Sequence, residues 1–241
     1  IKASAIEKVL LFGDSLMAGY GLPKEHHLSL VLQNNLKDDG LNIEVINGSV
    51  SGSTSSGGLN RAEWTLSEPG IDLIILGLGA NDMLRGIQPL ETEKNLEEII
   101  NIATNKQIKI VIAGMIAPTS HGITYKKQFD AIYPKLSKKY NLPLIPFLLE
   151  GVALDPSLNL QDGIHPNKEG TIIISETLQK IIMTLINDIL DLSKIEAGRL
   201  ELFVSDFSVA NVLQVLESLA KPLADKSEVV FDVIGDLGHM R

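Results

Sequence analysis

The stretch KVLLFGDSLMAGYGLP, residues 8–23, decides the fold. Its first part, KVLLF, is a short apolar run of the kind found in strands that are buried on both faces of a parallel sheet. Ser15 therefore stands where a buried strand gives way to another element. Two interpretations are open for it: a serine that caps the next helix, or a nucleophile that attacks a substrate.

The rest of the chain repeats the pattern of that first strand. Similar runs occur at 43–47, 71–78, 109–114 and 143–147. Segments with helical periodicity lie between them, at 26–38, 91–105 and 125–140. Because strand and helix alternate, the sequence predicts an α/β fold: a three-layer α/β/α arrangement around an open parallel sheet of about five strands.

Composition narrows the function classes. The chain has 241 residues, 44% of them hydrophobic, and a formal charge of −9, which disfavours binding to nucleic acid or to anionic lipid. It has no cysteine, which excludes disulfides and thiolate chemistry. No apolar run approaches the roughly 20 residues that cross a bilayer, so no membrane span is expected. We expect a periplasmic or secreted protein if a signal peptide preceded Ile1, and a cytoplasmic one otherwise.

Ligands of open parallel sheets bind at the carboxyl ends of the strands. A serine nucleophile at that edge needs a histidine to take its proton and a carboxylate to orient the histidine. The segment LQDGIHPN, residues 160–167, supplies both as Asp162 and His165. The alternative for His165 is an ordinary loop histidine beside a proline.

Acyl transfer also needs donors for a negatively charged oxygen. Three candidates follow three different predicted strands: the backbone amides of Ser15 and Gly52, and the side-chain amide of Asn81. Glycine suits a close approach of backbone to ligand because it lacks Cβ. The alternative for Asn81 is a turn residue in the sequence AND.

Four ordered segments carry a family resemblance: FGDSLMAGYGLP (12–23), VSGSTSSGG (50–58), GANDMLRG (79–86) and DGIHPN (162–167). Together they resemble the SGNH, or GDSL, hydrolases, over residues 8 to about 180. Within that superfamily the chain is most similar to the bacterial thioesterase, arylesterase and lysophospholipase group, on the segment FDAIYPKLSKKYNLPLIPFLLEGV (129–152). The resemblance implies a flavodoxin-like fold with a hydrolase domain at residues 1–180.

The same resemblance implies roles for the candidate residues. Ser15 would be the nucleophile, His165 the general base, and Asp162 its orienting carboxylate, while Ser15, Gly52 and Asn81 would form the oxyanion hole. The implied reaction is hydrolysis of a small-molecule carboxylic ester or thioester through an acyl-enzyme, and it needs no metal or cofactor. A carbohydrate acetylesterase would use the same triad.

Apolar residues after the third and fourth strands are candidates for an acyl-binding groove, with simple anchoring of the loops as the alternative. They are Met83, Leu84, Ile87, Met115 and Ile116.

Residues 181–241 raise a separate question. The sequence INDILDLSKIEAG (186–198) and the residues after it resemble a truncated sensor histidine kinase, from the second dimerisation helix to the start of the ATPase domain. We expect a long helix at about 168–197, an αβ extension after it, and a module boundary near 180. Apolar residues from Leu178 to Leu192 alternate in steps of four and three, as in a coiled coil. They predict a homodimer through residues 178–197, and the alternative is a fusion piece that folds back. A rival interpretation makes this tail the functional part, as a non-catalytic signalling or oligomerisation module.

Overall fold

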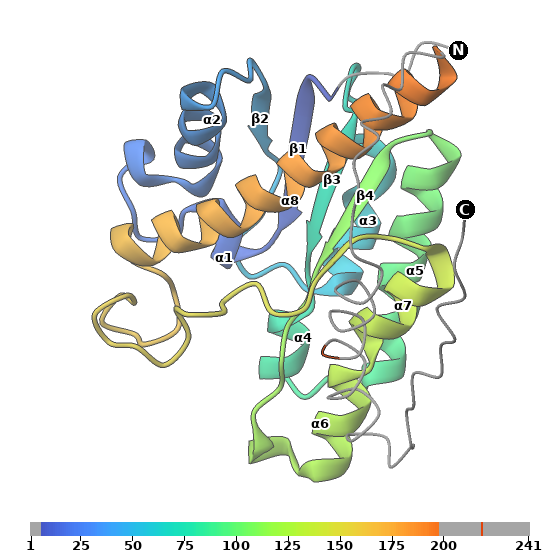
Figure 1. Ribbon diagram of the computed structural model, residues 1–241. Helices are drawn as coiled ribbons and strands as arrows, with labels where there is room; N and C mark the ends of the chain where they lie inside the picture. The colour runs from blue at the N-terminus through green and yellow to red at the C-terminus, as the bar shows by residue number, and fades with distance from the viewer. Residues whose placement is uncertain (1–5, 198–217, 219–241) are drawn as a thin grey trace. The chain divides into compact units, whose positions relative to one another are not determined.

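A five-stranded parallel sheet forms the centre of the structure (Figure 1), a computed structural model that describes residues 6–197 and Ser218. The strands are β1 (Lys8–Gly13), β2 (Glu44–Asn47), β3 (Leu73–Gly77), β4 (Lys109–Ala113) and β5 (Leu144–Ile145). Their order is β2-β1-β3-β4-β5, and every neighbouring pair is parallel. The predicted α/β architecture is confirmed. The direction in which successive strands are added to the sheet reverses between β1 and β3, and doubly wound sheets bind ligands at such a point.

Helices cover both faces of the sheet (Figure 1). They are α1 (Ser15–Ala18), α2 (Leu28–Asp38), α3 (Ser55–Thr65), α4 (Ala80–Leu84), α5 (Pro89–Asn105), α6 (Ile123–Asp130), α7 (Ile132–Tyr140) and α8 (Lys168–Glu196), with short 3₁₀ helices η1 (Lys24–His26) and η2 (Thr119–His121). Helix α2 packs against α8 on one face, and α5 packs against α3 and α7 on the other. The strands β1, β3 and β4 between these layers are almost wholly buried, which explains their continuous apolar sequence.

One helical segment differs from the sequence expectation, and helix α3 was not among the predicted segments. The segment 125–140 forms two helices, α6 and α7, that meet at Ala131. Pro134 has no N–H to continue the α6 ladder, and it is tolerated in the first turn of a new helix. The serine- and glycine-rich cluster at 48–58 is helical from Ser55, because the Thr54 hydroxyl accepts a hydrogen bond from the Gly57 amide at 3.1 Å and caps α3.

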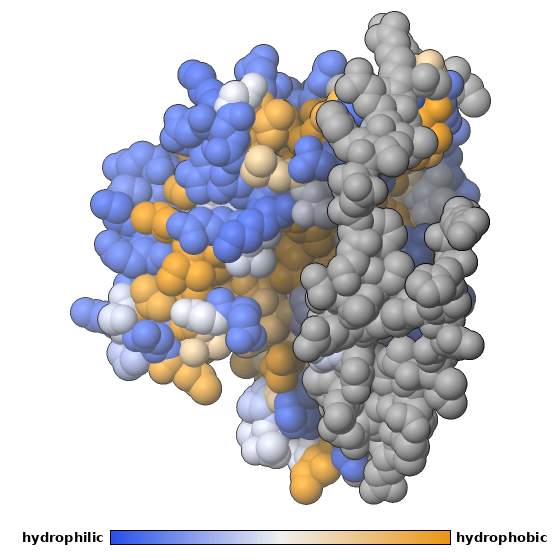
Figure 2. Space-filling view, in the orientation of Figure 1, coloured by the Kyte–Doolittle hydropathy of each residue, from blue (hydrophilic) through white to orange (hydrophobic). Residues whose placement is uncertain are grey.

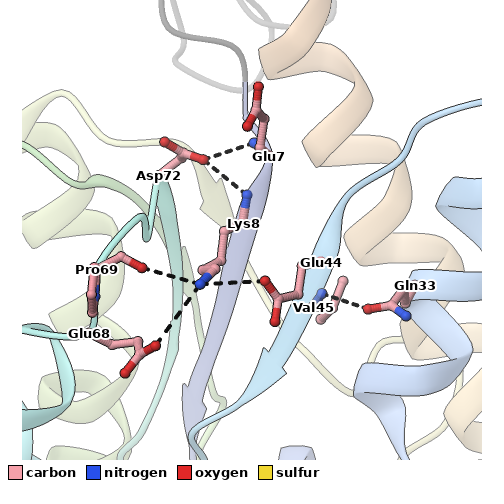
Figure 3. A network of polar contacts seen from close by, with 8 residues as sticks. All are labelled: Glu7, Lys8, Gln33, Glu44, Val45, Glu68, Pro69 and Asp72. Atoms are coloured by element: carbon pink, nitrogen blue, oxygen red, sulfur yellow. Dashed lines mark hydrogen bonds and ion pairs between the residues drawn. The ribbon is translucent and has the colours of Figure 1, made fainter.

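Polar contacts fasten the amino ends of the central strands, opposite the edge where the candidate residues lie (Figure 3). Asp72 Oδ2 accepts hydrogen bonds from the backbone amides of Glu7 (2.8 Å) and Lys8 (2.9 Å). The Lys8 ammonium lies 3.4 Å from Glu44 Oε2 and 4.0 Å from Glu68 Oε1. These contacts join the starts of β1, β2 and β3, and so help to fix their register.

Helix α8 spans the predicted boundary at residue 180 without a break. The chain divides into one compact unit of residues 1–197 and a second of 198–241, so α8 belongs to the same unit as the sheet. Leu178 and Ile182 of the predicted dimer seam are fully buried in that unit, whereas Leu192 is 54% exposed. None of the helices in the described part of the chain is long and apolar enough to span a membrane. The kinase-like resemblance falls mostly on residues 198–241, which lie outside the described residues apart from Ser218.

Candidate active site

Ser15 lies two residues after the end of β1, at the edge of the sheet formed by the carboxyl ends of the strands. Asp14 caps α1, since its Oδ1 accepts a hydrogen bond from the Leu16 amide at 3.0 Å, and Ser15 is the first residue of that helix. Met17 Sδ fills the space where Gly13 and Gly77 lack a Cβ, because an added Cβ would lie only 2.5 Å and 2.4 Å from this sulfur. These two strand-end glycines let α1 pack directly on the sheet. The capping role considered for Ser15 belongs to Asp14 instead.

Ser15, His165 and Asp162 form a continuous hydrogen-bonded chain. The Ser15 hydroxyl lies 2.8 Å from His165 Nε2, and His165 Nδ1 lies 2.7 Å from Asp162 Oδ2. Asp162 Oδ1 also accepts hydrogen bonds from the backbone amides of His165 (3.0 Å) and Ile164 (2.9 Å). These backbone hydrogen bonds, with that of the His165 ring, lower the pKa of Asp162 to about 2, so the carboxylate is ionised at neutral pH.

The loop that carries Asp162 and His165 closes on itself before α8. The Leu160 amide donates to the His165 carbonyl at 2.7 Å, and Asn159 and Pro166 form an antiparallel bridge. The His165 ring also lies against Tyr20, with 4.3 Å between the ring centroids. The imidazole is thus held by its loop, by Asp162 and by an aromatic neighbour.

The three predicted oxyanion donors come from the ends of β1, β2 and β3. Gly52 has φ of +77°, a conformation that L side chains rarely adopt, in the loop between β2 and α3. Asn81 lies in the first turn of α4, and its side-chain Nδ2 donates to Asp14 Oδ2 and to the Ser53 carbonyl, both at 3.2 Å. Arg85 Nη2 donates to the Gly52 carbonyl at 3.1 Å. The side chain of Asn81 thus joins α4 to Asp14, next to the serine, and to the loop of Gly52. Arg85 makes a second contact between α4 and that loop.

Asp14 is a fully buried carboxyl group between Leu16 and Asn81. Burial raises the pKa of Asp14 to about 6, and the hydrogen bonds from the Leu16 amide and the Asn81 side chain lower it in part. The group therefore carries its charge at neutral pH, where both donors stabilise it.

A largely apolar cavity of about 690 Å³ opens beside Ser15 and His165. Figure 2 shows hydrophobic side chains on both sides of the hollow between the loop before α8 and the segment around α4 and α6. Of the predicted groove residues, Met83, Leu84, Met115 and Ile116 line this cavity together with Gly52 and Asn81. Ile87 is not in the lining. Its backbone amide donates to the Asp82 carbonyl, and its carbonyl accepts a hydrogen bond from the Tyr125 hydroxyl of α6.

Several further residues that line the cavity were not predicted from the sequence. They are Tyr20, Phe147, Leu149, Ala153, Leu154 and Ile164. These residues follow β5 or flank the candidate triad, so the same rule about strand ends applied to β5 would have found Phe147 and Leu149. Among the described residues, no three His, Asp or Glu side chains come together as metal ligands.

Known proteins align with most of the length of this chain. The model of the GDSL-like Lipase/Acylhydrolase family matches residues 11–171. An arylesterase of Vibrio mimicus is 38% identical over 174 residues, covering 72% of this chain and 87% of the relative. The thioesterase 1/protease 1/lysophospholipase L1 of Escherichia coli K12 is 34% identical over 186 residues, covering 77% and 88%.

A solved structure extends the likeness to three dimensions. The psychrotrophic esterase EstA from Pseudoalteromonas sp., in a structure inhibited by monoethylphosphonate, has a TM-score of 0.72 and 29% identity, covering 75% of this chain and 99% of that one. Most of the length of each relative is therefore matched, and the matched region holds the strand ends and α1 described above. The chain belongs to the GDSL-like lipase/acylhydrolase family of SGNH hydrolases.

Proposed function

We propose that this carboxylic ester hydrolase cleaves small-molecule esters and thioesters through an acyl-enzyme on Ser15. The observation that carries the proposal is the chain of contacts from the Ser15 hydroxyl to His165 (2.8 Å) and on to Asp162 (2.7 Å), beside an apolar cavity. A serine hydroxyl is a weak nucleophile, and it needs a base that is itself held in one orientation.

In the acylation step, Ser15 Oγ attacks the carbonyl carbon as His165 Nε2 takes its proton. The hydrogen bond that His165 Nδ1 donates to Asp162 Oδ2 keeps the other ring proton on Nδ1, and the carboxylate stabilises the imidazolium. The negative oxygen of the tetrahedral intermediate is held by the backbone amides of Ser15 and Gly52 and by Asn81 Nδ2, which exchanges one of its two 3.2 Å contacts for the oxyanion. The intermediate collapses as His165 gives its proton to the leaving alcohol or thiol.

Deacylation repeats these steps with water. His165 takes a proton from a water molecule, which attacks the acyl carbon, and the second tetrahedral intermediate releases the acid and restores the Ser15 hydroxyl. Both half-reactions use the same oxyanion donors, so a defect in those donors slows acylation and deacylation together.

The cavity argues for an apolar acyl or aryl group in the substrate. Its walls carry Met83, Met115, Ile116, Phe147 and Leu149, and transfer of an alkyl chain onto such surface is favourable by about 0.8 kcal/mol per buried methylene. Relatives named arylesterase and thioesterase are consistent with this chemistry.

The test is hydrolysis of p-nitrophenyl esters from acetate to palmitate, and of one acyl thioester, by the wild type and by Ser15→Ala. We expect Ser15→Ala to lower kcat by on the order of 10³-fold or more for every substrate. Ser56→Ala, an exposed serine in the first turn of α3, is the matched control and should hydrolyse like the wild type. Residual activity of Ser15→Ala that equals the wild type would overturn the proposal.

We also propose that α8 pairs two chains through its carboxyl-terminal half. Leu192 (54% exposed), the last residue of the predicted seam, and Ile195 (56%), one turn further on the same face, support this pairing as exposed large apolar side chains. Light scattering after size exclusion at micromolar protein should give twice the chain mass, and a monomer would contradict the pairing. If instead the tail is a signalling module that carries the function, Ser15→Ala will leave the biological activity unchanged.

A further inference from the structure

Arg61 joins the two segments that carry the nucleophile and the oxyanion glycine. It projects from α3, and its Nη1 donates to the Gly48 carbonyl at 2.6 Å while Nη2 donates to the Gly13 carbonyl at 3.0 Å. Gly13 lies two residues before Ser15, and Gly48 lies four residues before Gly52. One planar side chain therefore spans the ends of β1 and β2, at the edge of the sheet where the site lies.

The chemistry around Arg61 is unusual for an arginine that only stabilises the fold. No carboxylate pairs with it among the residues that the structure describes, and its guanidinium lies over the Phe12 ring, 3.9 Å from the centroid. Its Nε is buried without a hydrogen-bond partner, and burial lowers its pKa. Two backbone carbonyls and an aromatic face offset the cost of the partial removal of this cation from water.

The segment that Arg61 reaches has no regular secondary structure of its own. Residues 48–54 connect β2 to α3, and Val50 donates its amide to the same Gly13 carbonyl at 3.1 Å. Gly52 at the tip of this loop has the left-handed conformation described above. Contacts with the β1 end therefore hold the loop that carries Gly52: those of Arg61, and also hydrogen bonds of Gly48, Ser49 and Val50.

We infer that Arg61 is a positioning residue of the oxyanion hole, which fixes the Gly52 loop relative to Ser15 through the carbonyls of Gly48 and Gly13. The inference rests on the proposed function. A planar group with several donors can hold two carbonyls at a set separation, and an ammonium cannot do so in the same way. A displacement of about 1 Å in a catalytic group can cost on the order of 100-fold in rate. Loss of the two Arg61 contacts would displace the oxyanion donor, and so lower kcat although Arg61 does not touch the substrate.

The test compares four forms of the enzyme: wild type, Arg61→Lys, Arg61→Met and Arg61→Ala. Arg61→Met keeps an apolar stem against Phe12 and removes the donors. We expect Arg61→Met and Arg61→Ala to lose about 10- to 100-fold in kcat with KM within twofold of the wild type. Arg61→Lys should lie between them and the wild type.

Two further readouts separate positioning from a loss of stability. A boronic acid that forms a tetrahedral adduct with the serine should bind more weakly to each variant in proportion to its loss of kcat/KM, whereas a fatty acid product should bind equally well. Free guanidinium can occupy the space left by the side chain in Arg61→Ala, and at about 10–30 mM it should restore part of the kcat of this variant. This concentration is about one hundredth of that which unfolds proteins. Sodium chloride at the same concentration is the control for ionic strength.

Unchanged kcat in the folded Arg61→Met variant would overturn the inference. Should Arg61→Met and Arg61→Ala fail to fold, Arg61→Lys decides alone: wild-type kcat and inhibitor affinity in that variant contradict it. Absence of any Ser15-dependent hydrolysis by the wild type is a different result, because it rejects the proposed function itself.

Discussion

Asp162 holds His165 at two points. Its Oδ2 lies 2.7 Å from the ring Nδ1, and its Oδ1 accepts a hydrogen bond from the backbone amide of the same residue at 3.0 Å. The Asp162 carboxylate therefore fixes both the imidazole ring of His165 and the backbone of His165. These paired contacts explain how a residue on a loop can serve as a rigid orienting group.

Replacement of that carboxylate by an amide tests its role. Asp162→Asn can still accept one backbone hydrogen bond, but its amide favours the wrong tautomer of His165, so we expect kcat to fall by on the order of 10³- to 10⁴-fold. Steady-state hydrolysis of p-nitrophenyl acetate measures it. Asp155→Asn is the matched control, because Asp155 also caps a turn, through Ser157, outside the triad. Equal activity in the two variants would remove Asp162 from the mechanism.

Gly52 is predicted to need its left-handed backbone for catalysis. Gly52→Ala imposes about 1–2 kcal/mol of strain at φ +77° and shifts the amide, so we expect a loss of roughly 100-fold in kcat. Gly40→Ala carries the same strain at φ +81°, and its added Cβ meets nothing within 4 Å. Assays and thermal melts of both variants should show similar destabilisation with loss of activity only at Gly52. A full-rate Gly52→Ala enzyme would argue against an oxyanion contact there.

Leu154 is predicted to contact the acyl chain at the mouth of the cavity. It is 94% exposed and has φ of +65°, while the buried Asn159 side chain holds the flanking carbonyls of Val152 and Asp155 at 2.7 Å each. Leu154→Gly should raise the melting temperature by relieving strain, and lower kcat/KM about 10-fold for long acyl esters but not for acetate.

The control for Leu154 is Gln107→Gly, which relieves a positive φ of 60° at a residue outside the cavity lining. This variant should gain stability without any change in chain-length preference. A parallel change for acetate and for long esters in Leu154→Gly would show that the side chain acts on the fold rather than on the acyl group.

The buried carboxyl of Asp14 predicts a pH-dependent term in stability. Its pKa is raised to about 6 in the folded protein, so its contribution is fully present below pH 4 and is lost as pH rises through 6. Relative to Asp14→Asn, the wild type should lose free energy of unfolding between pH 4 and pH 7. Urea titrations at several pH values measure this difference.

Asp155 provides the contrast for Asp14. Hydrogen bonds from Ser157 lower the pKa of Asp155, so its contribution is present above pH 4 and is lost below it. Parallel stability profiles of the wild type and Asp14→Asn across pH 4–7 would contradict the assigned state of Asp14.

Much of this architecture could be predicted from the sequence because strands buried on both faces leave a distinct apolar signature. The predicted runs at 8–12 and 109–114 match β1 (Lys8–Gly13) and β4 (Lys109–Ala113) closely. Ser15 and Asn81 directly follow such strands, and a parallel sheet brings the carboxyl ends of its strands to one edge. Their common location could therefore be predicted although 66 positions separate them in the sequence.

What the sequence could not predict depends on packing between segments. Asp14 resembles any helix cap in the sequence, and only its burial and its contact with Asn81 reveal an effect on the site. Arg61 looks like a surface residue of a helix, because its two carbonyl partners lie 13 and 48 positions away. Leu154 carries no signal in the sequence, because its positive φ occurs in a turn whose carbonyls, at Val152 and Asp155, accept hydrogen bonds from the side chain of Asn159.

The most direct test of the proposed mechanism is the mass of the protein after reaction with a p-nitrophenyl alkylphosphonate, combined with peptide mapping. Attack by Ser15 Oγ expels p-nitrophenolate and leaves the phosphonyl group on the serine. The mechanism predicts one phosphonyl group per chain, on the peptide that contains Ser15, with loss of activity in step with labelling and no label on Ser15→Ala. A label on another residue, or an unlabelled Ser15 in an enzyme that still hydrolyses esters, would contradict it.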